Sequence, residues 1–185
     1  MQTPNHPHAV RWHPVDRWLQ SSLAPQWRNW LADQGSLTQR LVAASNGRFD
    51  VRIIRQRYGR PTINEARALG LPLRQCALIR EVVLSGNHVP WVYARSVLPL
   101  ATLTGRLRAL GKLDNRPLGA LLFADKTLRR GAIDIARIPE GMIPEKLAQN
   151  APWLWGRRSL FYLDDKPLLV SEIFLPDFNP YNVES

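Results

Sequence analysis

Apolar side chains recur at every second position in several stretches of this chain, and short turn signals join some of these stretches in pairs. A period of two is typical of β-strands that turn one face toward a core. Gly86-Asn87 and the segment from Asp164 to Lys166 are turn signals of this kind, so they predict two hairpins. The first expected strand begins at Phe49. The other five cover residues 77–84, 89–98, 132–138, 153–163 and 167–175.

Helical segments are expected before and between these strands. Pro25 and Gly35 stand where a helix over 24–34 would start and stop, and Ser36 can cap a second helix over 37–44. Shorter helical segments are expected around Glu65 and over 102–113 and 117–123, with an irregular insertion over 139–152. Because hairpins imply antiparallel pairing, we predict an α+β domain with about six antiparallel strands and helices on one face.

The chain's length and composition fit a single domain. Its 185 residues are 45% apolar, enough to bury a core. Residues 1–14 are polar and are expected to form a flexible tail, and residues 15–185 the folded domain. No apolar run is long enough for a membrane span, and the N-terminus has no secretory signal, so we expect a cytoplasmic protein without stable membrane insertion.

A formal net charge of +10 attracts anions of every kind, including nucleic acid, lipid headgroups and small carboxylates. The basic residues are scattered, and neither a zinc-knuckle spacing nor an RNA-binding aromatic string accompanies them, so no nucleic-acid partner is expected. His6, His8 and His13 have no acidic or Cys neighbours, which favours a polar tail over a metal site. Four tryptophans of the N-terminal third are expected to pack on the sheet, although a membrane-surface helix is an alternative.

Two charges interrupt apolar rows of the expected strands. Arg80 shares a strand face with Leu78 and Val82, and Glu172 shares one with Val170 and other apolar residues. A buried ion without a partner costs several kcal/mol or more. The pattern leaves two interpretations open: the two residues pair with each other as a buried salt bridge, or they meet opposite ends of a ligand in a cavity.

Two further residues have competing interpretations. Arg95, in the strand over 89–98, is either a rim arginine stacked on an aromatic ring or a second anion contact at a cavity mouth. Cys76 precedes an apolar strand and is expected to be packed rather than a nucleophile. The chain has no glycine-rich phosphate loop, no nucleophile elbow and no zinc-protease helix motif.

Six stretches in this order resemble the chorismate–pyruvate lyase family of ubiquinone biosynthesis. They are SLTQRL at 36–41, LIREVVL at 78–84, VPWVYARSVLP at 89–99, RPLGALLF at 116–123, WLWGRRS at 153–159 and KPLLVSEIFLP at 166–176. The resemblance implies a six-stranded antiparallel sheet whose ligand lies in a closed internal cavity beneath two helical flaps. It makes residues 15–185 a chorismate lyase-like domain.

The resemblance also implies roles for individual residues. Arg80 matches the arginine that binds the ring carboxylate, Leu37 and Leu118 match flap positions whose backbone N–H groups hold it, and Glu172 matches the acid that hydrogen-bonds the ring hydroxyl. Arg95 is our candidate for the enolpyruvyl carboxylate. Arg80 and Glu172 are then the catalytic candidates.

The expected activity is the cofactor-free and metal-free elimination of pyruvate from chorismate to give 4-hydroxybenzoate, the first committed step of ubiquinone biosynthesis. We expect a monomer whose partners are this substrate and product. The main alternative is a non-catalytic domain of the same fold that senses small carboxylates, because such domains occur in bacterial transcription regulators and a fold does not fix a function.

Overall fold

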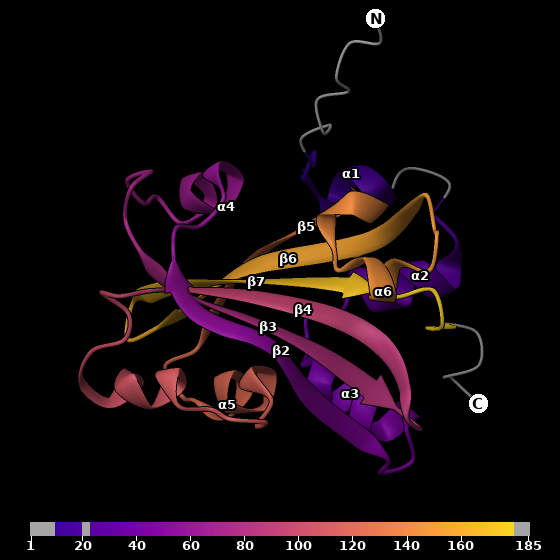
Figure 1. Cartoon of the computed structure of the whole chain (residues 1–185), viewed down its shortest axis with the longest axis horizontal. Helices are drawn as coiled ribbons and strands as arrows, with labels where there is room; N and C mark the ends of the chain where they lie inside the picture. Colours follow the sequence, from indigo (N-terminus) through magenta and orange to yellow (C-terminus); the bar gives the residue numbers. More distant parts are fainter. Residues whose placement is uncertain (1–9, 20–22, 180–185) are drawn as a thin grey trace, which may run out of the picture.

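The computed structural model describes residues 10–19 and 23–179, which form one antiparallel sheet with helices on both sides (Figure 1). The strand order is β1-β5-β6-β7-β4-β3-β2. Six strands are long, and β1 is a two-residue strand at one edge. The bounds are β1 His13–Pro14, β2 Phe49–Gly59, β3 Ala77–Gly86, β4 Val89–Pro99, β5 Arg129–Pro139, β6 Trp153–Leu163 and β7 Lys166–Phe174. The α+β class, the antiparallel pairing and both hairpins are therefore confirmed.

The first hairpin turns one residue later than the sequence predicts. Asn87 and His88 have positive φ angles of 54° and 66°, which are the conformations of a two-residue hairpin turn. Gly86 still ends β3 and is needed for a different reason. A Cβ atom at this position would lie 2.1 Å from the Trp91 ring, so only glycine lets the indole pack against the strand.

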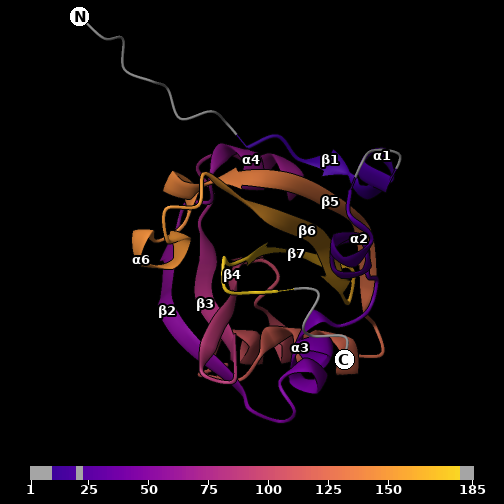
Figure 2. The same ribbon diagram turned by 90° about the vertical axis from the view of Figure 1, so that its right-hand side faces the viewer.

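The inner face of the sheet carries Leu78, Arg80 and Val82 of β3 and is the concave face in Figure 2. The N-terminal helices and the helices that follow β4 cover it, and Trp30, Leu41 and Phe174 are among its most buried residues. These elements are α2 Pro25–Leu31, α3 Leu37–Ala44, the 3-10 helix η1 Gly105–Gly111 and α5 Leu118–Ala124. This face therefore holds most of the core.

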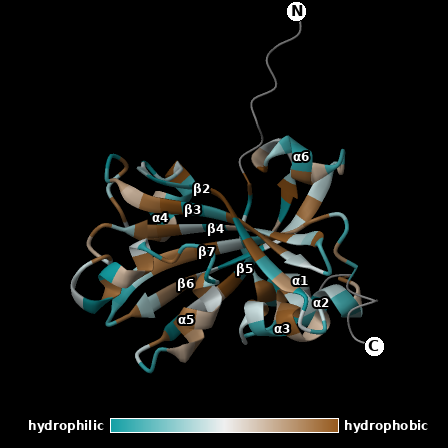
Figure 3. Ribbon diagram, turned by 60° about the horizontal axis from the view of Figure 1, so that its bottom comes forward, coloured by the Kyte–Doolittle hydropathy of each residue, from teal (hydrophilic) through white to brown (hydrophobic). Residues whose placement is uncertain are grey.

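The outer face carries Ile79, Glu81 and Val83 of β3 and has helices of its own, so the helices are not confined to one face as the sequence suggested. α4 Ile63–Ala68 packs there, as does the 139–152 insertion, which forms the 3-10 helix η2 Glu140–Met142 and α6 Glu145–Ala148. Both faces are covered because both rows of the central strands are largely apolar, as the hydrophobic segments along the strands in Figure 3 show.

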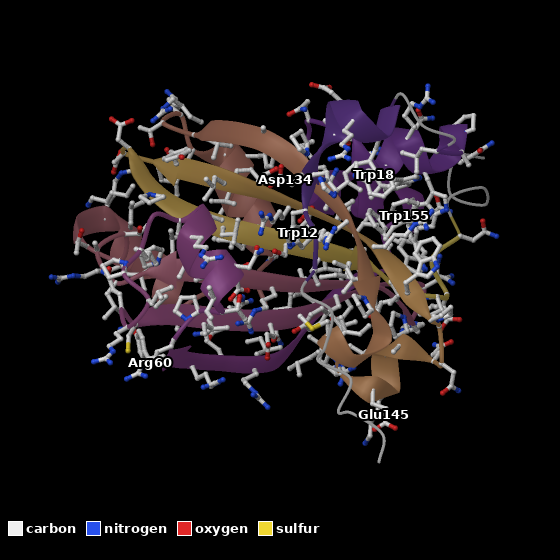
Figure 4. The ribbon with its side chains drawn as sticks, turned by 90° about the horizontal axis from the view of Figure 1, so that it is seen from above. Trp12, Trp18, Arg60, Asp134, Glu145 and Trp155 are labelled. Carbon is white, nitrogen blue, oxygen red and sulfur yellow. The ribbon has the colours of Figure 1, made fainter. Side chains whose placement is uncertain are left out.

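Local sequence explains where the helices that border the inner face begin. Ser36 caps α3, since its hydroxyl accepts from the Gln39 N–H at 3.3 Å, and the predicted bounds of α3 are confirmed. Pro117 precedes α5, which begins at Leu118. The predicted packing of tryptophans is confirmed as well: Trp18 meets Trp155 edge-to-face at 5.2 Å (Figure 4), and Trp30 lies in the core.

The N-terminal segment and Cys76 differ from the predictions. Residues 1–9 of the expected tail lie outside the described residues, but His13 and Pro14 pair with Ile135 and Asp134 of β5, and α1 Val15–Leu19 follows directly. Cys76 is exposed, so its predicted packing is wrong; β3 begins only at the next residue. Over residues 10–19 and 23–179, no helix is long and apolar enough to cross a bilayer.

Candidate active site

A cavity, here called the central cavity, lies between the inner face of the sheet and the first residues of α3 and α5. Arg80, Glu172, Leu37 and Leu118, four of the five predicted site residues, all line it. Its other lining residues are Gly35, Thr38, Val51, Val82, Leu84, Ala94, Ser96, Pro117, Gly119, Leu122, Phe123, Arg130, Arg157, Phe161 and Val170. The walls are mostly apolar, with a few converging polar groups, as is usual in a small-molecule site.

Arg80 is 2% exposed and donates only to neutral acceptors. Its Nη1 donates to Gln56 Oε1 at 2.7 Å, and its Nη2 donates to the carbonyls of Asp114 at 2.6 Å and Arg116 at 3.2 Å. Burial lowers the pKa of the Arg80 guanidinium, although the Asp114 carboxylate works in the opposite direction. Within the described residues no carboxylate forms an ion pair with Arg80, which lines the cavity.

Glu172 does not pair with Arg80, which removes one of the two interpretations of the sequence pattern. Its Oε2 accepts from Arg157 Nε at 2.7 Å instead. Arg157 is 1% exposed, and its Nη1 also donates to the carbonyls of Trp30 at 2.8 Å and Asp33 at 3.1 Å. Arg157 therefore fixes Glu172 against the cavity wall by a charge-assisted hydrogen bond.

Arg130 is a further cation of the central cavity. Its Nε donates to Ser159 Oγ at 3.1 Å, and its Nη1 donates to the carbonyls of Asp33 and Gly35, both at 3.2 Å. Burial and the neighbouring Arg157 charge lower the pKa of Arg130 to about 10, whereas Glu172 and Asp33 raise it in part. Arg130 is thus protonated at neutral pH.

Leu37 and Leu118 are the first residues of α3 and α5, and both are buried against the cavity. The first N–H groups of a helix have no partner within the helix, so these two positions present donors toward an anion. The helices touch closely there, since a Cβ atom on Gly119 would lie 2.6 Å from Thr38 Oγ1. The two helix starts therefore form one lid over the cavity.

Arg95 is not part of the central cavity, so its predicted role as a ligand contact there is corrected. In β4 the neighbouring Ala94 and Ser96 face the cavity, and Arg95 therefore points to the outer face. It donates to Glu65 Oε1 and to Glu81 Oε1, both at 2.6 Å. Although burial alone would lower the pKa of Arg95, the two carboxylates raise it well above its ordinary value.

The outer face has a pocket of its own, lined by Arg95, Glu65, Glu81, Arg158 and Trp12 among others. Arg158 bridges Trp12 and Asp134, which lie near each other in Figure 4: it donates to Asp134 Oδ2 at 3.2 Å and lies 4.6 Å from the Trp12 ring centre. The charged side chains around this outer pocket are thus already paired with one another. Arg95 and Arg158 therefore both form ion pairs on this face.

Sequence reasoning missed Arg157 and Arg130. Arg157 had the same signal as Arg80, because it shares a strand face with Trp155, Ser159 and Phe161. Arg130 had no such signal. The pairing of β5 with β6 shifts between Arg130 and Ile133, and this irregularity decides which face Arg130 reaches.

A cavity with three arginines and one glutamate among apolar walls is the kind of site that suits a small organic anion. Comparison with known families identifies the family of the protein: the model of the family described as chorismate lyase matches residues 6–182. The chain therefore belongs to the chorismate lyase family and is an enzyme of the lyase class.

Individual relatives agree with this assignment. A protein named "Probable chorismate pyruvate-lyase" from Pseudomonas fluorescens is 41% identical over 175 residues, which cover 92% of each chain. Relatives of the same name from Methylococcus capsulatus and Azoarcus sp. are 42% and 44% identical; the alignments cover 80% of this chain and 93% and 83% of theirs. The chain thus spans nearly the whole length of these relatives.

Solved structures show the same fold in another class of protein. The effector domain of PhnF from Mycobacterium smegmatis matches with a TM-score of 0.56 at 19% identity, covering 78% of this chain and 91% of that one. A GntR-family transcriptional regulator from Bacillus cereus matches with a TM-score of 0.54 at 15% identity, covering 71% and 95%. At these identities the likeness concerns the fold alone.

Proposed function

We propose that this enzyme eliminates pyruvate from chorismate and releases 4-hydroxybenzoate. One observation carries the proposal: Arg80 and Glu172 line the same cavity and are not bonded to each other. Chorismate bears a ring carboxylate at one end and a ring hydroxyl at the other. A guanidinium and a carboxylate on the walls of one cavity match these two groups.

Arg80 binds the ring carboxylate in this proposal. The planar guanidinium can present two N–H groups to a carboxylate, and burial makes this interaction stronger than it would be in water. The N–H groups of Leu37 and Leu118 add donors from the lid formed by α3 and α5. The same contacts would hold the carboxylate of 4-hydroxybenzoate after the reaction.

Glu172 accepts a hydrogen bond from the ring hydroxyl. Arg157 occupies its Oε2, and no described residue donates a hydrogen bond to its Oε1, so this atom is free for a ligand. As the ether bond breaks, the ring becomes electron-poor at the carbon that loses the ether oxygen. This carbon is next to the one that bears the hydroxyl. A fixed carboxylate at this position stabilises that change of charge.

The reaction depends more on how the substrate is positioned than on a reactive group of the protein. The bond between the ring carbon and the ether oxygen breaks, and the hydrogen on the neighbouring hydroxyl-bearing carbon is lost, so the ring becomes aromatic. The ring hydrogen leaves as a proton and a proton is added to the carbon that becomes the methyl group of pyruvate, so the dianionic substrate yields two monoanions without any redox change. Orientation and charge placement in a water-poor cavity are the contributions that this reaction needs, so we propose catalysis without a cofactor.

The decisive experiment is to mix the purified protein with chorismate and to follow 4-hydroxybenzoate by absorbance and pyruvate by a coupled assay. Both products should appear in equal amounts. Glu172→Gln should lower the rate by about 10²–10³-fold, the effect of losing one electrostatic contact to the transition state. Glu145→Gln, which changes an exposed carboxylate of α6 (Figure 4), is the matched control and should keep full activity.

Binding of chorismate without turnover would contradict the proposal and would favour a sensor domain with the fold of the GntR-family regulators. We further place the reaction at the first committed step of ubiquinone biosynthesis, in a cytoplasmic monomer. Bacteria that lack this gene should then make ubiquinone only when 4-hydroxybenzoate is supplied. Ubiquinone synthesis that persists without the supplement would contradict this placement.

A further inference from the structure

We propose that Arg130 binds the second carboxylate of the substrate, the one on the enolpyruvyl group. This inference rests on the proposed function and replaces Arg95 in that role. It makes Arg130 a residue that distinguishes a dicarboxylate substrate from a monocarboxylate product.

Two of the arginines that line the central cavity form no ion pair with any described residue, so two ligand carboxylates would balance their charges. Arg80, Arg130 and Arg157 face a single acid, Glu172, and that acid pairs with Arg157. Arg80 and Arg130 remain, and both donate only to carbonyl, amide or hydroxyl oxygens. A partly or wholly buried guanidinium outside an ion pair is costly, and a dianion compensates both of these.

Arg130 has the free donor capacity that the role needs. Its Nε and Nη1 are used by Ser159 and by the carbonyls of Asp33 and Gly35, but no hydrogen bond of Nη2 falls on a described residue. Three neutral contacts fix the direction of the guanidinium, and the Phe161 ring lies 5.2 Å beneath it. Arg157 cannot take the role, because it is 1% exposed and already bonded to Glu172 and two carbonyls.

The order of the strands places Arg130 at the correct end of the substrate. Arg80 stands on β3, whereas Arg130 stands on β5, beyond the β6 and β7 strands that carry Arg157 and Glu172. In chorismate the ether carbon is next to the hydroxyl-bearing carbon and away from the ring carboxylate. A ring bound between Arg80 and Glu172 therefore directs its enolpyruvyl group toward the Arg130 side.

This arrangement separates substrate binding from product binding. When the ether bond breaks, the enolpyruvyl carboxylate leaves with pyruvate, and 4-hydroxybenzoate keeps only the carboxylate at Arg80. Arg130 contacts chorismate and pyruvate but not 4-hydroxybenzoate. Its charge also stabilises the negative charge that develops on the leaving group, so it acts on the transition state.

The test compares Arg130→Gln with Arg129→Gln, a change in the neighbouring exposed residue that pairs with Asp165 at the surface. Steady-state assays with chorismate give kcat and KM, and calorimetry gives the Kd of 4-hydroxybenzoate. For Arg130→Gln we expect kcat/KM to fall about 30- to 1000-fold, as for a lost buried charge pair, while the Kd of 4-hydroxybenzoate stays within about twofold. Arg130→Lys should recover part of the loss, and Arg129→Gln should behave as the wild type.

Three results would overturn the inference: an unchanged kcat/KM, an equal loss of chorismate and 4-hydroxybenzoate binding, or the same effect from Arg129→Gln. Thermal unfolding of each variant identifies a loss that comes from misfolding, and Arg130→Lys then carries the test. If the wild type does not turn over chorismate, the proposed function fails by itself. Calorimetry with unreacted chorismate still decides whether Arg130 recognises the second carboxylate.

Discussion

Arg157 Nε donates to Glu172 Oε2 across 2.7 Å, and the same guanidinium donates to the carbonyls of Trp30 and Asp33. One buried side chain thus joins β6 and β7 to the end of α2 and to the loop before α3. It orients the acid of the site and holds the N-terminal helices against the sheet.

Arg157→Gln should therefore cost stability as well as activity. It leaves the half-buried Glu172 without its ion-pair partner, and removing one partner of a fully buried pair costs about 3–5 kcal/mol, so we expect a loss toward the lower end of that range. Urea denaturation measures the free energy of unfolding. Arg129→Gln removes an exposed pair and should cost at most about 1 kcal/mol. Equal stabilities of these two variants would show that the Arg157 contact contributes no more than a surface pair.

Arg80→Gln should weaken binding of 4-hydroxybenzoate. Loss of a buried, hydrogen-bonded charge contact with a ligand costs about 2–5 kcal/mol. Calorimetry should show this loss for the product and for chorismate alike, in contrast to Arg130→Gln. An unchanged Kd for 4-hydroxybenzoate would remove Arg80 from the ligand site.

Gly119→Ala should loosen the lid over the central cavity. The new Cβ atom would lie 2.6 Å from Thr38 Oγ1 and 3.5 Å from Thr38 Cβ, so either the buried Thr38 hydroxyl rotates away or α3 and α5 move apart. We expect a loss of about 1–3 kcal/mol in stability, as for other overpacked sites, and faster dissociation of 4-hydroxybenzoate in stopped-flow experiments. Gly141→Ala is the control, since its Cβ atom meets nothing within 4 Å. Wild-type dissociation from Gly119→Ala would mean that this contact does not retain the product.

Glu65 should make the fold sensitive to acid. Burial alone would raise the pKa of Glu65, but the hydrogen bonds and charge of Arg95 outweigh burial and lower it below its ordinary value of 4.5. The unfolded chain therefore binds the proton more readily than the folded one. The stability contributed by Glu65 is complete above pH 4.5 and is lost as the pH falls through the lower, folded pKa.

Glu65→Gln tests this pH dependence. The variant should be less stable than the wild type by about 1–3 kcal/mol at neutral pH, the cost of leaving a buried charged partner unsatisfied. The difference in urea midpoints should shrink as the pH falls below 4.5. A constant difference over this range would show that Glu65 contributes through packing rather than through its charge.

The sequence predicts the architecture and half of the charged site. Period-two alternation located the six long strands. A charge in an apolar row singled out Arg80 and Glu172, and the family resemblance made them the expected ligand contacts. Arg95 could not be placed in this way, because both rows of β4 are apolar and only the pairing with Glu81 shows which face it takes. Arg130 depends on a strand irregularity, and such local shifts have no reliable sequence signal.

The outer helices show a second limit of the sequence. The sequence showed that the second face of the central strands is apolar. It did not show which segments of the chain would cover that face. The 139–152 insertion and Val10 and Trp12 do so by contacts distant along the chain. Long-range contacts of this kind follow from the packed structure rather than from local propensity.

The pairing of β4 with β7, which sets Ala94 opposite Glu172, joins one hairpin to the other and brings Arg80 and Glu172 to the same cavity. Each hairpin can form locally, but this junction spans a long stretch of chain and closes slowly. During translation the nascent protein cannot hold its substrate until β7 has left the ribosome and docked beside β4. Recognition of the ring is therefore a property of the completed sheet, and a bound ligand favours that last docking step.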